Sequence, residues 1–115
     1  MDDQKQDKRF FPRYYTVKSE IEAKLFRKSN MTQIEGHFFD VSRDGIGFMA
    51  KEREVAGQSV ILKLEKRKIE FQIMYCTGDL LQPDQFRLGL RRQGSQENLV
   101  TLFQSHGFLA EGETP

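Results

Sequence analysis

Residues 38–48 read FFDVSRDGIGF, and this stretch carries the strongest structural signal in the chain. Its apolar ends are typical of strands, whereas its centre is polar. Asp40 and Ser42 have short side chains that bond to nearby backbone, and Gly45 tolerates positive φ angles. We therefore predict a bend that joins two strands, over residues 33–41 and 45–50.

The flanking sequence alternates between apolar and polar residues, the pattern of a strand with one buried face and one face in water. Ile69, Phe71 and Ile73, for example, alternate with charged or amide residues. The same pattern predicts four further strands, over residues 20–25, 60–65, 68–75 and 86–91.

Turn-forming residues separate these strands. They cluster at residues 28–30, 56–58, 78–79 and 83–84. Lys66-Arg67 lies between two alternating runs and predicts a tight hairpin. Six short strands leave unpaired edges, and closing into a barrel removes those edges. We therefore expect an antiparallel β-barrel of six strands.

The end of the chain has a helical period instead. Its apolar face would contain Leu99, Leu102, Phe103 and His106. Ser95 is a suitable N-cap, Gly107 is a suitable C′ residue, and Phe108 could then contact Phe103 across the helix end. The expected fold is all-β with a C-terminal helix over about residues 95–106.

Composition is that of one soluble domain. The 115 residues suffice for a single core, and 30% are charged against 37% hydrophobic. Residues 1–7 are polar and predict a disordered tail, as do residues 109–115. Without an apolar membrane span or a secretion signal, and with Cys76 as its one cysteine, we expect a cytoplasmic protein.

A second motif precedes the first, because Arg9 and Arg13 form an Arg-x-x-x-Arg pattern around an aromatic pair. Pro12 favours extended backbone before it, so residues 8–13 predict a short arm across the domain. Two guanidinium forks can serve phosphates or the O6/N7 edge of guanine. The pattern is weak by itself: Arg87 to Arg91 repeats it, as polar-face positions on a predicted strand.

In their order and chemistry the two motifs resemble those of the PilZ domain, the bacterial receptor module for cyclic di-GMP. The resemblance covers about residues 8–106 and implies a six-stranded antiparallel barrel with a C-terminal helix, here over residues 8–108. It implies a non-catalytic receptor that relays the second messenger to a partner protein, in processes such as motility or biofilm formation.

The resemblance also implies the roles of individual residues. Arg9 and Arg13 would grip phosphates and guanine edges from the arm. Asp40 and Ser42 would hydrogen-bond the ligand from the barrel, and Gly45 would permit the bend and a close approach.

Two neighbours of the motifs, Lys8 and Arg43, are secondary candidates for the same ligand. A basic residue at position 8 would favour an intercalated dimer of the nucleotide, and Arg43 would add a phosphate contact. Tyr75 stands where many members of the family carry Trp. In the implied mechanism the arm is mobile without the ligand, and binding folds it over the barrel.

No enzyme is indicated, because the sequence shows no nucleophile paired with a base, no phosphate-cradling loop and no metal-ligand spacing. His37 and His106 are expected to be ordinary surface or helix-end residues. We expect no cofactor, no membrane contact, and a monomer or weak dimer whose partners are cyclic di-GMP and an unidentified downstream protein.

Two alternatives keep the barrel and change the function. One is a protein-interaction adaptor that binds no nucleotide, for example in pilus assembly or motility. The other is a barrel for single-stranded nucleic acid, in which aromatic side chains would stack on bases. The aromatic candidates are Phe10, Phe11, Phe38, Phe39 and Phe48. A net charge of +1 argues against this second alternative.

Overall fold

The computed structural model describes residues 13–16, 23–94 and 98–109. Lys8, Arg9, the expected tail 1–7 and the expected N-cap Ser95 lie outside these residues. Leu109 was expected to begin a frayed tail, but it is buried and forms an isolated bridge with Thr16.

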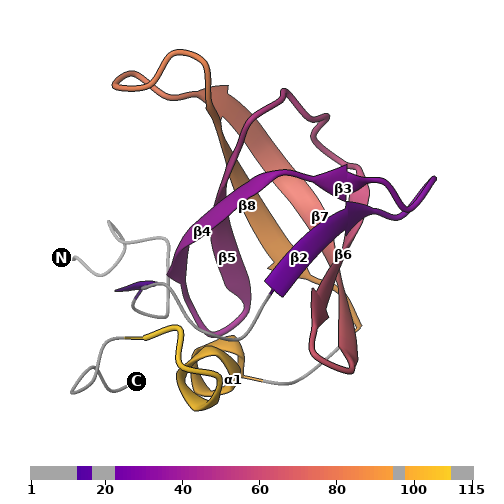
Figure 1. Ribbon diagram of the computed structural model, residues 1–115, viewed down its shortest axis with the longest axis vertical. Helices are drawn as coiled ribbons and strands as arrows, with labels where there is room; N and C mark the ends of the chain where they lie inside the picture. The colour runs from indigo at the N-terminus through magenta and orange to yellow at the C-terminus, as the bar shows by residue number, and fades with distance from the viewer. Residues whose placement is uncertain (1–12, 17–22, 95–97, 110–115) are drawn as a thin grey trace, which may run out of the picture.

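The described residues form one antiparallel sheet that curls around a core, with a single helix at one end (Figure 1). The strands are β1 (Tyr14–Tyr15), β2 (Ala23–Arg27), β3 (Gln33–Ile34), β4 (Gly36–Val41), β5 (Gly45–Ala50), β6 (Ser59–Leu64), β7 (Arg67–Gly78) and β8 (Phe86–Arg92). Their spatial order is β1-β4-β5-β8-β7-β6-β2-β3. The expected class, all-β with a C-terminal helix, is confirmed.

The strand count differs from the prediction at a single segment and at the arm. The predicted strand 33–41 is divided into β3 and β4 by Glu35, and β1 is an added strand from the arm. β3 pairs with β2 and β4 pairs with β5, so this one segment joins the two ends of the sheet order. The expected six strands thus appear as eight elements in the described part of the chain.

Gly36 makes this closure possible. Its φ angle is 153°, and a Cβ atom there would collide with the carbonyl of Met49 and lie 2.8 Å from the Phe48 ring. Only glycine lets the backbone of β4 approach β5 this closely at the first pair of their antiparallel ladder, where Gly36 faces Ala50.

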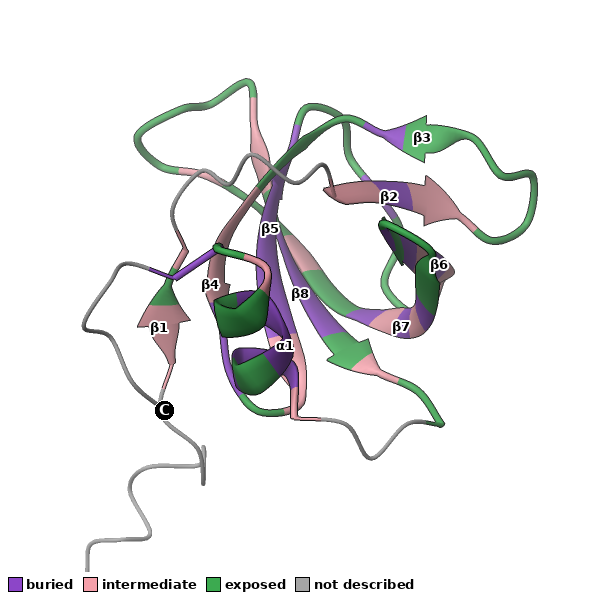
Figure 2. Ribbon diagram, turned by 60° about the horizontal axis from the view of Figure 1, so that its bottom comes forward, coloured by how far each residue is buried: buried purple, intermediate pink, exposed green. Residues whose placement is uncertain are grey.

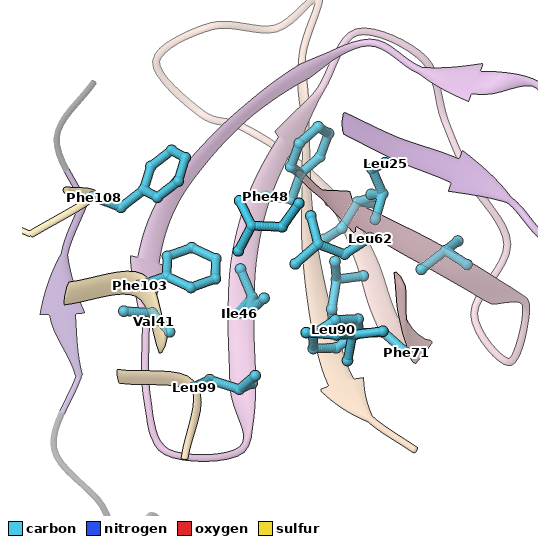
Figure 3. Packing of buried hydrophobic residues seen from close by; sticks show 14 of the residues in the cluster. Leu25, Val41, Ile46, Phe48, Leu62, Phe71, Leu90, Leu99, Phe103 and Phe108 are labelled. Carbon is cyan, nitrogen blue, oxygen red and sulfur yellow. The ribbon is translucent and has the colours of Figure 1, made fainter. Parts of the chain in front are cut away.

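The core lies inside the curled sheet and is completed by the helix (Figure 3). Alternate residues of β6 and β7 point inward as predicted, so that Leu62 and Phe71 are fully buried. β5 departs from strict alternation, because Ile46 through Ala50 are all buried (Figure 2). The hairpin between β6 and β7 turns at Glu65 and Lys66, one residue earlier than predicted.

The helix α1 (Leu99–Ser105) packs against β4, with the Phe103 ring 5.6 Å from that of Phe38 (Figure 2). It begins later than predicted, because the side chain of Asn98 caps the amides of Val100 and Thr101.

The end of the helix is as predicted. Gly107 has a φ of 81°, and the amide of Phe108 donates to the carbonyl of Phe103 at 2.9 Å. The two phenyl rings lie 5.2 Å apart, the apolar contact that accompanies this type of helix end.

Replacing Gly36 by alanine should destabilise the protein by about 3 kcal/mol, because the strained φ and the collision with Met49 act together. Gly78→Ala is the matched control, since nothing lies within 4 Å of its added methyl group. Chemical denaturation of both variants measures the difference. Equal stability of the two variants would contradict the role assigned to Gly36.

Candidate functional site

The bend between β4 and β5 is held by backbone hydrogen bonds from three parts of the chain. The amide of Ser42 donates to the carbonyl of Gly45 at 2.8 Å and closes the turn. Arg92 of β8 donates to the carbonyl of Asp44 at 3.1 Å, and Leu99 of α1 donates to that of Arg43 at 2.8 Å. The bend is therefore a rigid part of the barrel rim.

Arg13 reaches this bend from the arm and forms a two-pronged pair with Asp40. Its Nε lies 3.1 Å from one carboxylate oxygen and its Nη2 lies 2.8 Å from the other. Nη1 donates to the hydroxyl of Ser42 at 3.3 Å. This fork geometry is the strongest kind of arginine–carboxylate contact.

The short strand β1 places Arg13. Tyr14 pairs with Val41 and Tyr15 pairs with Asp40, so β1 runs antiparallel to the end of β4 and places Arg13 beside the bend. Thr16 continues the attachment, donating from its amide to Phe39 at 3.0 Å and from its hydroxyl to Phe38 at 2.9 Å.

The pair lies in a partly buried position, where the side chain of Arg13 is 24% exposed and that of Asp40 is 16% exposed. The hydrogen bond to Asp40 raises the pKa of Arg13, and its loss of hydration acts in the opposite direction. Arg13 therefore carries its positive charge at neutral pH.

The structure brings together four of the predicted site residues: Arg13, Asp40, Ser42 and Gly45. A Cβ atom on Gly45 would lie 3.1 Å from the carbonyl oxygen of Leu90, 3.5 Å from the Ser42 hydroxyl and 3.8 Å from Nη1 of Arg13. Gly45 has no positive φ, and its surroundings fit the expected close approach, because a Cβ atom there would crowd the carbonyl oxygen of Leu90. Arg43 is exposed on the bend, and Arg9 and Lys8 lie outside the described residues.

A row of small and aromatic residues continues the site across the outer face of the barrel. The register aligns Asp40, Gly47, Gly89 and Tyr75 on four adjacent strands. A Cβ on Gly47 would meet the Phe39 ring at 2.6 Å, and a Cβ on Gly89 would collide with the Tyr75 ring. The two glycines thus form a thin floor under two aromatic rings.

Sequence reasoning missed this outer face. It noted Tyr75 only as standing where many members of the PilZ family carry Trp, whereas this residue is 48% exposed and lies close enough to Arg13 to act on its pKa. It also set aside Arg87 and Arg91. Both are polar-face residues as predicted, but Arg87 stacks on Phe39 at 4.6 Å and Arg91 pairs with Gly45.

The signal that could have revealed this face was the position of the glycines. Gly47 and Gly89 each interrupt an otherwise alternating strand, and glycine inside a strand often marks a close approach to its backbone. Their pairing across β5 and β8 could not be read from the sequence.

Comparison with known proteins was informative at the level of structure. No protein-family model matches the chain, and no curated protein matches it. The PilZ domain with c-di-GMP of YcgR from Escherichia coli resembles it with a TM-score of 0.57 and 11% identity, over 76% of this chain and 79% of that one. This chain has a PilZ-type fold.

The PilZ-type fold agrees with the expected architecture and carries no further conclusion at this level of identity. Among the described residues, no cluster of three potential metal ligands is found. The described part of the chain also contains no helix that is long and apolar enough to span a membrane.

The Arg13–Asp40 pair should contribute about 1–2 kcal/mol to stability in a double-mutant cycle with alanine, because it is a charge-assisted fork in a partly buried position. A raised arginine pKa stabilises the fold at all pH values below the unfolded-state pKa, and this effect is lost only as the pH rises through the higher folded-state value. The coupling energy should therefore be the same at about pH 7 and about pH 10. Chemical denaturation of the wild type, both single variants and the double variant at each pH measures the coupling energy. A coupling energy that is lower at the higher pH would contradict the assignment.

Proposed function

We propose that this protein is a non-catalytic receptor for cyclic di-GMP. The observation that carries the proposal is the convergence of Arg13, Asp40 and Ser42 at a rigid bend on the rim of a PilZ-type barrel. These groups supply a cationic fork, a carboxylate and a hydroxyl, and the guanidinium of Arg13 donates hydrogen bonds to both of the other groups. A guanine nucleotide with two phosphates needs all three kinds of partner.

Each group has a defined role in this proposal. Asp40 accepts hydrogen bonds from the N–H donors of guanine, using the acceptor sites of its carboxylate that Arg13 leaves free. Arg13 donates to the phosphate or to the O6/N7 edge of guanine. Gly45 keeps the bend open to the ligand, and Arg9 supplies the second guanidinium from the arm.

The neighbouring face of the barrel supports the same ligand. The rings of Phe39 and Tyr75 cover Gly47 and Gly89, and Tyr75 is 48% exposed on this face. Arg87 and Arg91 are exposed on the same face of β8. Their positive charges favour an anion bound at the bend.

The proposed switch differs from a simple folding of the arm. Arg13 is already anchored by Asp40 and by the pairing of β1 with β4. Binding therefore exchanges part of the Arg13–Asp40 fork for contacts with the nucleotide. The segment before Arg13, which holds Lys8 and Arg9, then closes over the ligand, and a downstream protein recognises the closed form. We place this function in the cytoplasm, with the protein as a monomer or weak dimer.

The nucleic-acid alternative receives no support from the aromatic residues that suggested it. Phe48 is 2% exposed, and Phe38 packs edge-on against it at 4.9 Å. Phe39 is covered by Arg87. None of these three rings offers an open face to a base, and Phe10 and Phe11 lie outside the described residues.

Isothermal titration calorimetry with cyclic di-GMP tests the proposal. Arg13→Ala and Asp40→Ala should each weaken binding by roughly tenfold or more, because each removes a charge-assisted partner. Arg13→Lys should also weaken it, since lysine keeps the charge and loses the fork. Lys63→Ala, an exposed cation on β6, is the control and should bind as the wild type does.

The ligand should be recovered intact after prolonged incubation, as judged by chromatography, because the protein is proposed to be a receptor only. Binding of cyclic di-AMP at equal strength would contradict guanine recognition by Asp40. Absence of binding by the wild-type protein would leave the ligand-independent adaptor as the function of this fold.

A further inference from the structure

The hairpin that joins β7 to β8 exposes two adjacent leucines. Leu80 is 98% exposed and Leu81 is 90% exposed, the highest values among the large apolar residues in the described ranges. Leaving two leucine side chains in water forgoes a substantial stabilisation that burial would provide. A contiguous exposed apolar feature of this kind is typical of an interaction site.

The turn that carries these leucines is well ordered. The amide of Asp79 donates to Gln85 at 3.0 Å, and the amide of Gln85 donates to Gln82 at 2.9 Å. The carboxylate of Asp79 accepts from the amide of Gln82 at 3.0 Å. The amides of Asp79, Gln82 and Gln85 are therefore satisfied within the tip, and both leucines project from this turn into solvent.

The tip lies at the opposite end of the barrel from the nucleotide site (Figure 1). On β5 and β8, Ala50 pairs with Phe86 next to the tip, whereas Gly45 pairs with Arg91 next to the bend. Five residues of strand separate the two ends, a distance of roughly 17 Å. A protein bound at the tip would leave the bend accessible to a small ligand.

The charge around the tip defines the partner. Residues 79–85 include Asp79 and Asp84 and contain no lysine or arginine, and the cation at the base of the tip, Arg53, is stacked on the Phe86 ring at 4.7 Å. An anionic lipid surface would repel this tip. Two tips meeting about a two-fold axis would place like charges against each other. A protein pocket with apolar walls and a basic rim complements both the leucines and the carboxylates.

We propose that the Leu80–Leu81 tip is the docking element for a partner protein, and that it inserts both leucines into an apolar pocket bordered by lysine or arginine. Docking at the tip is constitutive, and it is a separate event from the recognition of the closed, nucleotide-bound form at the bend. The protein is thus attached to its partner by one end and exposes its ligand site at the other.

The partner is first identified by photo-crosslinking in the native cells. A photoreactive residue replaces the exposed Gln82 at the tip, and the same replacement at the exposed Gln93, at the far end of β8, is the control. A polypeptide crosslinked at position 82 and not at position 93 is then purified, and its affinity for the protein is measured by fluorescence anisotropy.

Variants test the chemistry of the contact. The double substitution L80S/L81S should weaken binding by roughly 100-fold, because it removes both buried side chains. Asp84→Lys should weaken it by roughly tenfold, and less so at high salt. Val55→Ser is the matched control, because Val55 is also an exposed apolar residue (69%) and lies outside the tip. Val55→Ser should leave the affinity for the partner unchanged.

The proposal is overturned if no polypeptide crosslinks at position 82 without also crosslinking at position 93. It is also overturned if the crosslinked polypeptide binds L80S/L81S as tightly as it binds the wild-type protein. Binding to anionic lipid vesicles that L80S/L81S abolishes would assign the tip to a membrane instead. Sedimentation that shows wild-type oligomers and monomeric L80S/L81S would assign it to self-association.

Discussion

The fold depends on a single segment that pairs with different neighbours along its length. β3 pairs with β2, and after Glu35 the chain continues as β4 and pairs with β5. This change of partner turns an open sheet into a closed one and leaves few edges unpaired. It requires a glycine at position 36, where the backbone approaches Met49 too closely for any side chain. The far end of the same segment carries Asp40, so the closure of the barrel also positions the candidate site.

The bend after β4 is rigid because it belongs to several elements at once. Its carbonyls accept from β8 and from the first residue of α1, and its own Ser42 amide closes the turn. Arg13 adds a side-chain fork from the arm. We expected the arm to be the moving half of the site, but its last residue is anchored within the protein. In the proposed function, ligand binding at this site therefore competes with contacts that the protein makes with itself.

Much of the architecture could be predicted because it follows from local sequence. The alternation correctly placed the inner faces of β6, of β8 and of β7 as far as Ile73, whereas Tyr75 follows a register shift and is 48% exposed. The bend after Val41 was recognised from its polar centre. The Gly107–Phe108 helix end was also correct. The start of the helix was wrong because Ser95 and Asn98 are both good caps, and local chemistry does not choose between them. A close approach at Gly45 was expected, but the group that crowds it, the carbonyl oxygen of Leu90, could not be named, because Leu90 is distant in sequence.

The sequence by itself determined the strands, the bend and the end of the helix, because periodicity and turn chemistry act between residues a few positions apart. Only the tertiary structure decided that Arg13 forms a fork with Asp40 and that Gly47 lies beside Gly89. It also decided that Leu80 and Leu81 have no core to enter. These features depend on which strands become neighbours, and strand pairing is determined by the burial of the whole core rather than by any short stretch of the chain.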